Sequence, residues 1–255
     1  MDLYDYPDIY DERFTEGANK AYREHYKKMF SGCDITDILD CSIGTGCLTF
    51  CLCELGYQVY GSDLSSSMLN KAGEKAAEKG FNVPLTQCDF RELSKNFNRK
   101  FSLVMSSGNA FAHVANSDVV KTIKEMDKLV APGGYFYYDS RNWEKELKNK
   151  QHFQFARPFI KEDGTRINYV QVWDYHADES ITINILNAYE KDGQIIRQDV
   201  FEEHLNPFKL DLVTSTLKTL GYGEINVKPC PYFSDAEFED IGWYCVLAKK
   251  TESGC

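Results

Sequence analysis

Short apolar runs alternate with amphipathic stretches along the first 140 residues. Each apolar run ends in polar or turn-forming residues, and the stretches between the runs repeat their apolar positions with a helical period. Such alternation predicts a parallel sheet covered by helices on both faces. The expected strands are residues 37–41, 57–63, 83–89, 101–107 and 135–140, and the expected helices are residues 17–31, 47–56, 65–79 and 116–130.

Local signals mark two of these boundaries and one later turn. Ser65 is the expected N-cap of the second helix that follows a strand. The Ala-Pro-Gly-Gly sequence of residues 131–134 is expected to stop a helix before the next strand. Between residues 150 and 206 the pattern changes to the alternation of long antiparallel strands, and Lys191-Asp192-Gly193-Gln194 is typical of a hairpin turn.

The remaining chain completes an α/β fold. A helix at residues 210–222 is followed by two strands, 224–233 and 241–250, that predict an antiparallel hairpin at the edge of the sheet. We therefore expect a doubly wound, Rossmann-like sheet of seven strands with the last one antiparallel. Its core would comprise residues 1–149, including an N-terminal helical segment, and 207–255, with residues 150–206 as an inserted antiparallel β cap, or lid.

Composition excludes several classes of partner. The formal net charge is −10 and no dense basic stretch occurs, so we expect no nucleic-acid partner. No window approaches the roughly 18 uninterrupted apolar residues of a membrane helix, so we expect no membrane partner. The acidic, Tyr-rich N-terminus differs from a targeting signal, which predicts a soluble, cytoplasmic protein.

Nine cysteines raise the question of a metal site. Cys41, Cys47, Cys51 and Cys53 crowd together, but their spacing is not the paired Cys-x-x-Cys of zinc sites, so we expect no bound metal. Cys47 and Cys51 are one helical turn apart, which favours buried free thiols on a helix that packs against the sheet.

A glycine turn and three acids suggest a nucleoside-binding site. Gly44 and Gly46 follow the first strand, and Asp63 ends the second, where it could accept both hydroxyls of a ribose. Asp40 ends the first strand, and Asp89 follows the third. This pattern fits either a nicotinamide dinucleotide or S-adenosylmethionine. Because an acid at Asp40 repels pyrophosphate and suits a cation, the sequence favours S-adenosylmethionine.

At this point the chain resembles the class I methyltransferases over nearly its whole length, through ILDCSIGTG, YGSDLSSSML, QCDF and APGG. The segment GNAFAH at 108–113 and the segment YYDSRNWE at 137–144 resemble those of the glycine and sarcosine N-methyltransferases. The resemblance implies a methyltransferase sheet and S-adenosyl-L-methionine as cofactor. The residues and the resemblance together predict cofactor binding by Asp40, Ser42, Gly44, Gly46, Asp63, Leu64, Met68, Asp89, Phe90, Ser107, Gly108 and His113.

The resemblance also implies an acceptor site. Asn109 would approach the acceptor amine, and Arg141 would hold its carboxylate, unless Arg141 forms a local ion pair with Asp139 or Glu144. His113 would pack on the cofactor or act as a base. Candidates for lining the amine site are Tyr10, Tyr22, Tyr169 and Tyr175. Trp143, Trp173 and Tyr175 would either shape the pocket or lie in the core, and we expect the core for each of them.

The expected function is therefore methyl transfer to the nitrogen of a small amine or amino acid, resembling glycine or sarcosine. One alternative is another small acceptor, such as a sugar amine or a hydroxyl compound. A second alternative is a non-catalytic protein that binds S-adenosylmethionine. The expected partner is a small molecule bearing an amine and a carboxylate, and the sequence leaves the oligomeric state open.

Overall fold

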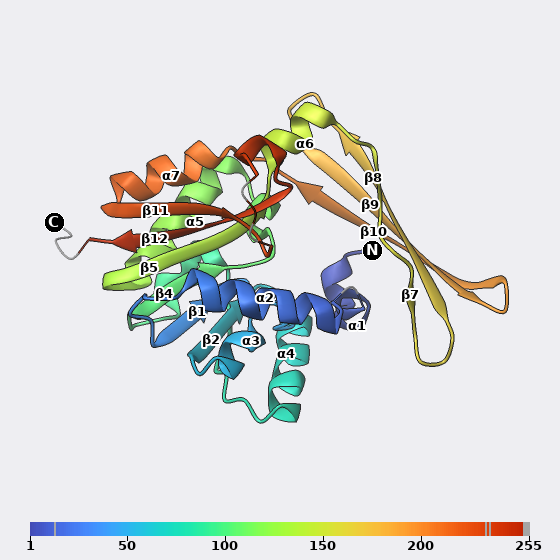
Figure 1. Ribbon diagram of the computed structural model, residues 1–255, viewed down its shortest axis with the longest axis horizontal. Helices are drawn as coiled ribbons and strands as arrows, with labels where there is room; N and C mark the ends of the chain where they lie inside the picture. The colour runs from blue at the N-terminus through green and yellow to red at the C-terminus, as the bar shows by residue number, and fades with distance from the viewer. Residues whose placement is uncertain (13, 233, 235, 252–255) are drawn as a thin grey trace.

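Seven strands form the central sheet of the computed structural model, which describes residues 1–12, 14–232, 234 and 236–251 (Figure 1). The order is β11-β12-β5-β4-β1-β2-β3; β1 to β5 are parallel, and β12 is antiparallel to both β5 and β11. This confirms the predicted fold class. The strands are β1 (Asp37–Asp40), β2 (Gln58–Asp63), β3 (Leu85–Gln87), β4 (Phe101–Ser106), β5 (Val130–Arg141), β11 (Tyr222–Pro229) and β12 (Trp243–Lys250).

Helices cover both faces of this sheet because successive strand residues point to opposite sides. Ile38 belongs to the apolar cluster beneath one set of helices, and its neighbour Leu39 belongs to the cluster beneath the other. Among the described residues, no helix is long and apolar enough to cross a membrane. One face carries α2 (Glu16–Met29), α3 (Phe50–Glu54) and α4 (Ser66–Glu78), and the other carries α5 (Asn116–Leu129) and α7 (Leu210–Thr219) (Figure 1).

One local prediction was wrong, and one was right about where a helix ends but not about where the next strand begins. Helix α3 begins at Phe50, so Cys47 lies in the preceding turn; there its Sγ is 3.0 Å from both Asp11 Oδ1 and Lys75 Nζ, instead of packing on a helix. Helix α5 ends at Leu129, so the helix stop predicted before residues 131–134 is confirmed. Those residues themselves belong to β5, which begins at Val130 and has a register shift against β4. The N-cap prediction is confirmed, since the Ser65 hydroxyl accepts from the N–H of Met68.

A second, antiparallel sheet, which we call the lid sheet, follows α6 (Trp143–Asn149). Its strand order is β10-β9-β8-β6, with β7 also paired to β8. Asp192 and Gly193 both have positive φ, as a type I′ hairpin turn requires, which confirms the predicted turn. The strands are β6 (Phe153–Phe155), β7 (Phe159–Ile160), β8 (Arg166–Tyr175), β9 (Ile181–Lys191) and β10 (Gln194–Leu205).

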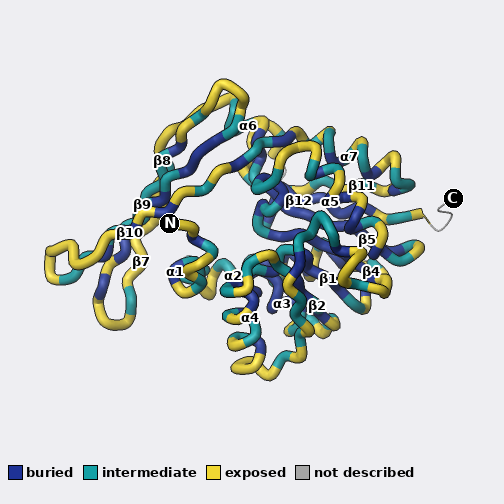
Figure 2. The backbone as a smooth tube through the Cα atoms, turned by 180° about the vertical axis from the view of Figure 1, so that it is seen from behind, coloured by how far each residue is buried: buried dark blue, intermediate teal, exposed yellow. Residues whose placement is uncertain are grey.

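The inner face of the lid sheet packs against the helices and strands of the central sheet. Trp173, Ile183 and Phe201 are buried in the same apolar cluster as the residues of α5. The N-terminal α1 (Pro7–Asp11) and the short helix before it lie close to β10, and Tyr6 contacts Phe201 at a ring distance of 5.6 Å (Figure 1). The far hairpin ends project beyond the core and are largely exposed (Figure 2).

The turn between β1 and α3 depends on Gly46. Its φ of +78° is in the left-handed region, and a Cβ atom there would lie 2.4 Å from the Phe50 ring. Gly32 has the same φ of +78° but no atom within 4 Å of its would-be Cβ. The two glycines therefore share a backbone conformation and differ in the space available.

We expect Gly46→Ala to lower the free energy of unfolding by roughly 1–3 kcal/mol more than Gly32→Ala, because only the first substitution adds overpacking to backbone strain. Urea denaturation of both variants and the wild type would measure the difference. Equal losses in the two variants would contradict a packing role for Gly46.

Candidate active site

A cavity of about 940 Å³ lies at the carboxyl ends of the parallel strands. Strand β1 lies between β4 and β2, so the strand order reverses beside this edge, where open α/β sheets bind ligands. Residues of β10 and of the first turn of the chain complete the wall. Of the residues predicted from the sequence, the wall includes Tyr10, Ser42, Gly44, Asp63, Leu64, Met68, Asp89, Phe90, Ser107, Gly108 and His113.

Asp63 joins the end of β2 to the glycine turn after β1. The Gly44 N–H donates to Asp63 Oδ2 at 2.8 Å, and the Ser65 N–H donates to Oδ1 at 2.9 Å. Burial raises the pKa of the Asp63 carboxyl, and these backbone N–H groups oppose that rise. Each carboxylate oxygen keeps a further acceptor site, so Asp63 can accept from two neighbouring hydroxyl groups of a ligand.

Asp40 lies beneath the cavity and not in its wall, contrary to the expectation that it faces the ligand. Its fully buried carboxylate accepts from the Thr49 hydroxyl, from the Ser107 hydroxyl at 2.8 Å and from the Ser42 N–H at 3.0 Å. Burial raises the pKa of Asp40, and these donors oppose the rise. Asp40 thus positions wall residues, and Gly46 likewise lies outside the wall.

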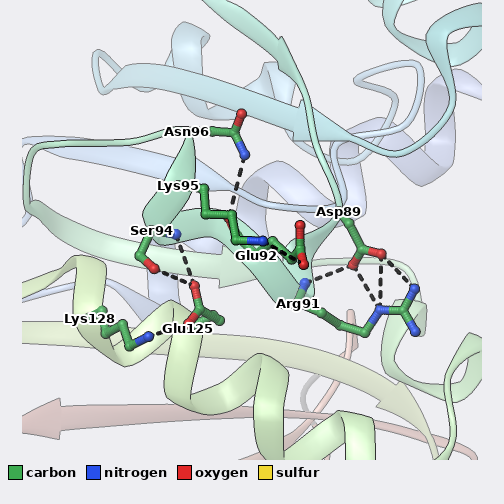
Figure 3. A network of polar contacts seen from close by, with 8 residues as sticks. All are labelled: Asp89, Arg91, Glu92, Ser94, Lys95, Asn96, Glu125 and Lys128. Carbon is green, nitrogen blue, oxygen red and sulfur yellow. Dashed lines mark hydrogen bonds and ion pairs between the residues drawn. The ribbon is translucent and has the colours of Figure 1, made fainter.

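Asp89 forms an ion pair within the wall (Figure 3). The Arg91 guanidinium approaches its carboxylate to 2.6 Å and reaches Asp118 on α5 at 2.8 Å. Hydrogen bonds from Arg91 lower the pKa of Asp89, so this carboxyl is ionised at neutral pH. Phe90 packs beside Phe111 at a ring distance of 6.1 Å. Arg91 was not predicted from the sequence, although it follows Asp89 by two positions.

His113 ends the short helix at Ala110–His113 and contacts the N-terminal segment. The Tyr4 hydroxyl lies 3.0 Å from His113 Nε2, and the hydroxyls of Ser65 and Ser67 donate to the Tyr4 carbonyl oxygen. Burial lowers the pKa of His113, so its ring is neutral at pH 7. Tyr4 was missed from the sequence; the only signal was the Tyr-rich opening of the chain.

Asn109 connects β4 to β5 and does not line the cavity, which differs from its expected place beside the acceptor amine. Its backbone is left-handed, with φ of +66°. Its side-chain oxygen accepts from the Ser140 hydroxyl at 2.9 Å and from the Arg141 N–H at 3.2 Å. The amide oxygen of Asn109 therefore holds the backbone at the end of β5, where the Arg141 side chain begins.

Arg141 lies under the lid sheet, outside the cavity wall. Its guanidinium stands 4.8 Å from the Trp173 ring centre and 5.3 Å from that of Trp243. It forms a long ion pair of 3.7 Å with Glu146, and not with the expected Asp139 or Glu144. Within the described part of the chain it donates no hydrogen bond. Burial lowers the pKa of Arg141, but a guanidinium remains charged.

Tyr169 and Tyr175 lie on the inner face of the lid sheet. Together with Gln171 and Trp173 they occupy every second position of β8, so all four side chains share one face, the face that contacts Arg141. Neither tyrosine lines the cavity itself. Trp173 and Trp143 are fully buried, which confirms that both belong to the core. The structure therefore places Tyr169 and Tyr175 beside Arg141 and outside the cavity wall. Tyr22 is buried on α2 and also lies outside that wall.

The cavity wall is acidic. Its one cationic side chain among the described lining residues, Arg91, is neutralised by Asp89 and Asp118. An acidic wall repels the pyrophosphate of a dinucleotide and attracts a cation. No group of three or more metal-binding side chains occurs in the described residues. The wall carboxylates are those of Asp2, Asp5, Asp63, Asp89, Glu202 and Glu203.

Known proteins resemble this chain in both sequence and fold. A family model described as a methyltransferase domain matches residues 38–134. A glycine/sarcosine N-methyltransferase of Halorhodospira halochloris is 34% identical over 193 residues, which span 75% of this chain and 67% of that protein.

Solved structures share the fold at lower identity. The CcbJ methyltransferase from Streptomyces caelestis is 17% identical, with a TM-score of 0.78 and 98% of each chain covered. The sugar N-methyltransferase KedS8 from Streptoalloteichus sp. is also 17% identical, with a TM-score of 0.70, and the match covers 97% of this chain and 93% of that one.

S-adenosylmethionine, the cofactor of such enzymes, fits the residues present. Its sulfonium and ammonium groups suit an acidic wall, and its ribose hydroxyls suit the two remaining acceptor sites of Asp63. The fold, the wall and the sequence relatives agree. The chain belongs to the class I S-adenosylmethionine-dependent methyltransferases.

Proposed function

We propose that the protein methylates the nitrogen of a small amino acid, such as glycine or sarcosine. The observation that carries this proposal is Arg141. Its guanidinium is largely buried against three tryptophan rings, and it donates no hydrogen bond to any described residue. A planar guanidinium in such surroundings suits bidentate binding of a carboxylate. The relative from Halorhodospira halochloris, named a glycine/sarcosine N-methyltransferase, supports the same acceptor.

Cofactor binding is assigned to the wall residues. Ser42 and Gly44 would hold the methionine part, and Asp63 would accept from the ribose. Asp89 and Phe90 would meet the adenine, with Arg91 limiting how far the Asp89 carboxylate can reach. The rest of the cofactor would be flanked by Leu64, Met68, Ser107, Gly108 and His113.

The lid sheet and the chain before it would form the acceptor side. Residues 150–206 act in this proposal as a cap, and its inner face carries Tyr169 and Tyr175 beside Arg141. Tyr10 would contribute from the N-terminal side, where it lines the cavity. Asn109 would act as a positioning residue, because its amide oxygen fixes the Arg141 backbone.

Methyl transfer needs orientation more than chemical activation. Bound S-adenosylmethionine supplies a methyl group on a sulfonium, which leaves as a thioether. An acceptor that arrives as an ammonium first passes one proton to water. The protein then holds the neutral amine so that its lone pair forms the N–C bond as the C–S bond breaks, and the positive charge moves to the nitrogen. His113 remains neutral, and the Tyr4 hydroxyl occupies its Nε2, which favours a packing role over that of a base.

An amino sugar is the second candidate acceptor. The acidic wall favours a cationic amine without requiring a carboxylate, and the shared fold with a sugar N-methyltransferase extends through nearly the whole chain. This alternative assigns no ligand to Arg141. Substitution of that residue therefore separates the two candidates.

We expect the wild type to methylate glycine or sarcosine in an assay with labelled S-adenosylmethionine. Arg141→Ala should then lower kcat/KM for the amino acid roughly 30- to 1,000-fold, because removing one partner of a buried charge pair costs about 2–4 kcal/mol. Arg141→Lys keeps the charge but loses the planar guanidinium, so its kcat/KM should lie between those of the wild type and Arg141→Ala.

The control is Arg166→Ala, which removes an exposed lid arginine on the far part of β8. It should match the wild type, and all variants should keep the wild-type affinity for S-adenosylmethionine. Equal activity of Arg141→Ala and wild type, or turnover of amino sugars alone, would reject the amino-acid acceptor.

Asp63→Asn should weaken binding of S-adenosylhomocysteine about 10- to 150-fold, since hydrogen bonds to a charged acceptor contribute roughly 1.5–3 kcal/mol. Calorimetric titration would measure the affinity, and a thermal melt would show whether the fold is kept. Asp178→Asn, an exposed lid acid, is the matched control. Unchanged affinity in a folded Asp63→Asn variant would show that this carboxylate does not hold the cofactor.

A further inference from the structure

Glu203 is a lid carboxylate that faces the core. Along β10 it alternates with exposed residues and shares its face with Phe201 and Leu205, which are both buried in the core cluster. Glu203 is itself half-buried and lines the cavity. On the inner face of the lid sheet, the Glu203 carboxylate therefore lies between two buried apolar side chains, Phe201 and Leu205.

This carboxylate has no partner among the described residues: no hydrogen bond or ion pair engages it. Its neighbour Glu202 differs, because it lies 3.0 Å from His204 Nε2 on the opposite face of the strand. A half-buried anion without a cation loses hydration without compensation. The position is therefore suited to a ligand that brings a positive charge.

The strand register places Glu203 in one row with Trp173. Glu203 is opposite Ile183 on β9, and Ile183 is opposite Trp173 on β8. Directly opposite residues point to the same face, so this row crosses the inner face of the lid. Arg141 stacks beneath the Trp173 end of the row, at 4.8 Å. The backbones at its two ends are separated by two strand spacings, about 10 Å.

Arg141 and Glu203 thus carry opposite charges on the same side of the lid without forming an ion pair with each other. Burial lowers the pKa of Arg141, and the charges of Glu146 and Glu203 are among those that oppose this effect. Glu203 also acts on His113 across the cavity, where its charge opposes the lowering of the His113 pKa by burial. The acid therefore lies between the acceptor side and the cofactor side.

We propose that Glu203 determines acceptor specificity by binding the cationic nitrogen of the acceptor while Arg141 binds its carboxylate. This inference rests on the amino-acid acceptor proposed above. The two residues together select a zwitterion, since each half of the ligand meets one charge. Glu203 also stabilises the positive charge that the nitrogen gains when it is methylated.

The test uses Glu203→Gln, which keeps the side-chain shape and removes its charge. KM for glycine or sarcosine should rise roughly 10- to 100-fold, as for loss of a charge-assisted hydrogen bond, with a smaller change in kcat. The affinity for S-adenosylhomocysteine should not change. Glu203→Asp, which retains the charge, should recover part of the loss and serves as the second variant if the amide destabilises the lid.

Glycolate separates this role from a structural one, because it carries the carboxylate and replaces the ammonium with a hydroxyl. As a competitive inhibitor it should bind Glu203→Gln at least as well as it binds the wild type. It should bind Arg141→Ala poorly. Glu190→Gln, which removes a charge from the other face of β9, is the control and should behave as the wild type.

An unchanged KM for the amine in Glu203→Gln would overturn the inference while leaving the amino-acid acceptor intact. Equal weakening of glycolate and the amine would also overturn it, because a charge-specific role predicts opposite responses. Failure of the proposed function has a different signature: the wild type itself would not methylate any amine that bears a carboxylate.

Discussion

The buried carboxylate of Asp40 is the constraint on which the site depends. A carboxylate removed from water costs several kcal/mol unless hydrogen bonds satisfy it. Asp40 accepts hydrogen bonds from Thr49, from Ser42 in the turn after β1 and from Ser107 in the loop after β4. One anion therefore holds two loops in a fixed relation, and both loops form the cavity wall. Asp63 then joins the same turn to β2 through the Gly44 N–H.

Those parts of the fold that depend on local chemistry could be predicted from the sequence. The hairpin turn at residues 191–194 needs two positions of positive φ, and the Ser65 cap needs one hydroxyl. The predictions failed where distant residues decide the outcome. Cys47 contacts Asp11 and Lys75, which are remote in sequence, and α3 begins only after that turn. Pattern alone carries no information on such contacts.

The same distinction applies to the site. Residues at strand ends, such as Asp63 and Ser107, could be predicted because parallel strands bring their carboxyl ends to one edge. Tyr4 and Glu203 could not, since each reaches the cavity through the packing of another segment, the first turn of the chain or the lid sheet. Arg141 was identified by its motif, but its position outside the wall depends on the lid that covers it.

The structure keeps the positive charge of Arg141 apart from the acidic cavity wall. A cationic cofactor is favoured by an acidic wall and would be opposed by a guanidinium beside it. The lid sheet separates Arg141 from the cavity wall, because the guanidinium lies against the Trp173 ring, whose face attracts a cation. The wall therefore stays acidic. His113 is kept neutral by burial, so it adds no positive charge either. In the proposed function, an acceptor anchored through its carboxylate would extend away from Arg141 toward the acidic cavity, and its nitrogen would then face the methyl donor.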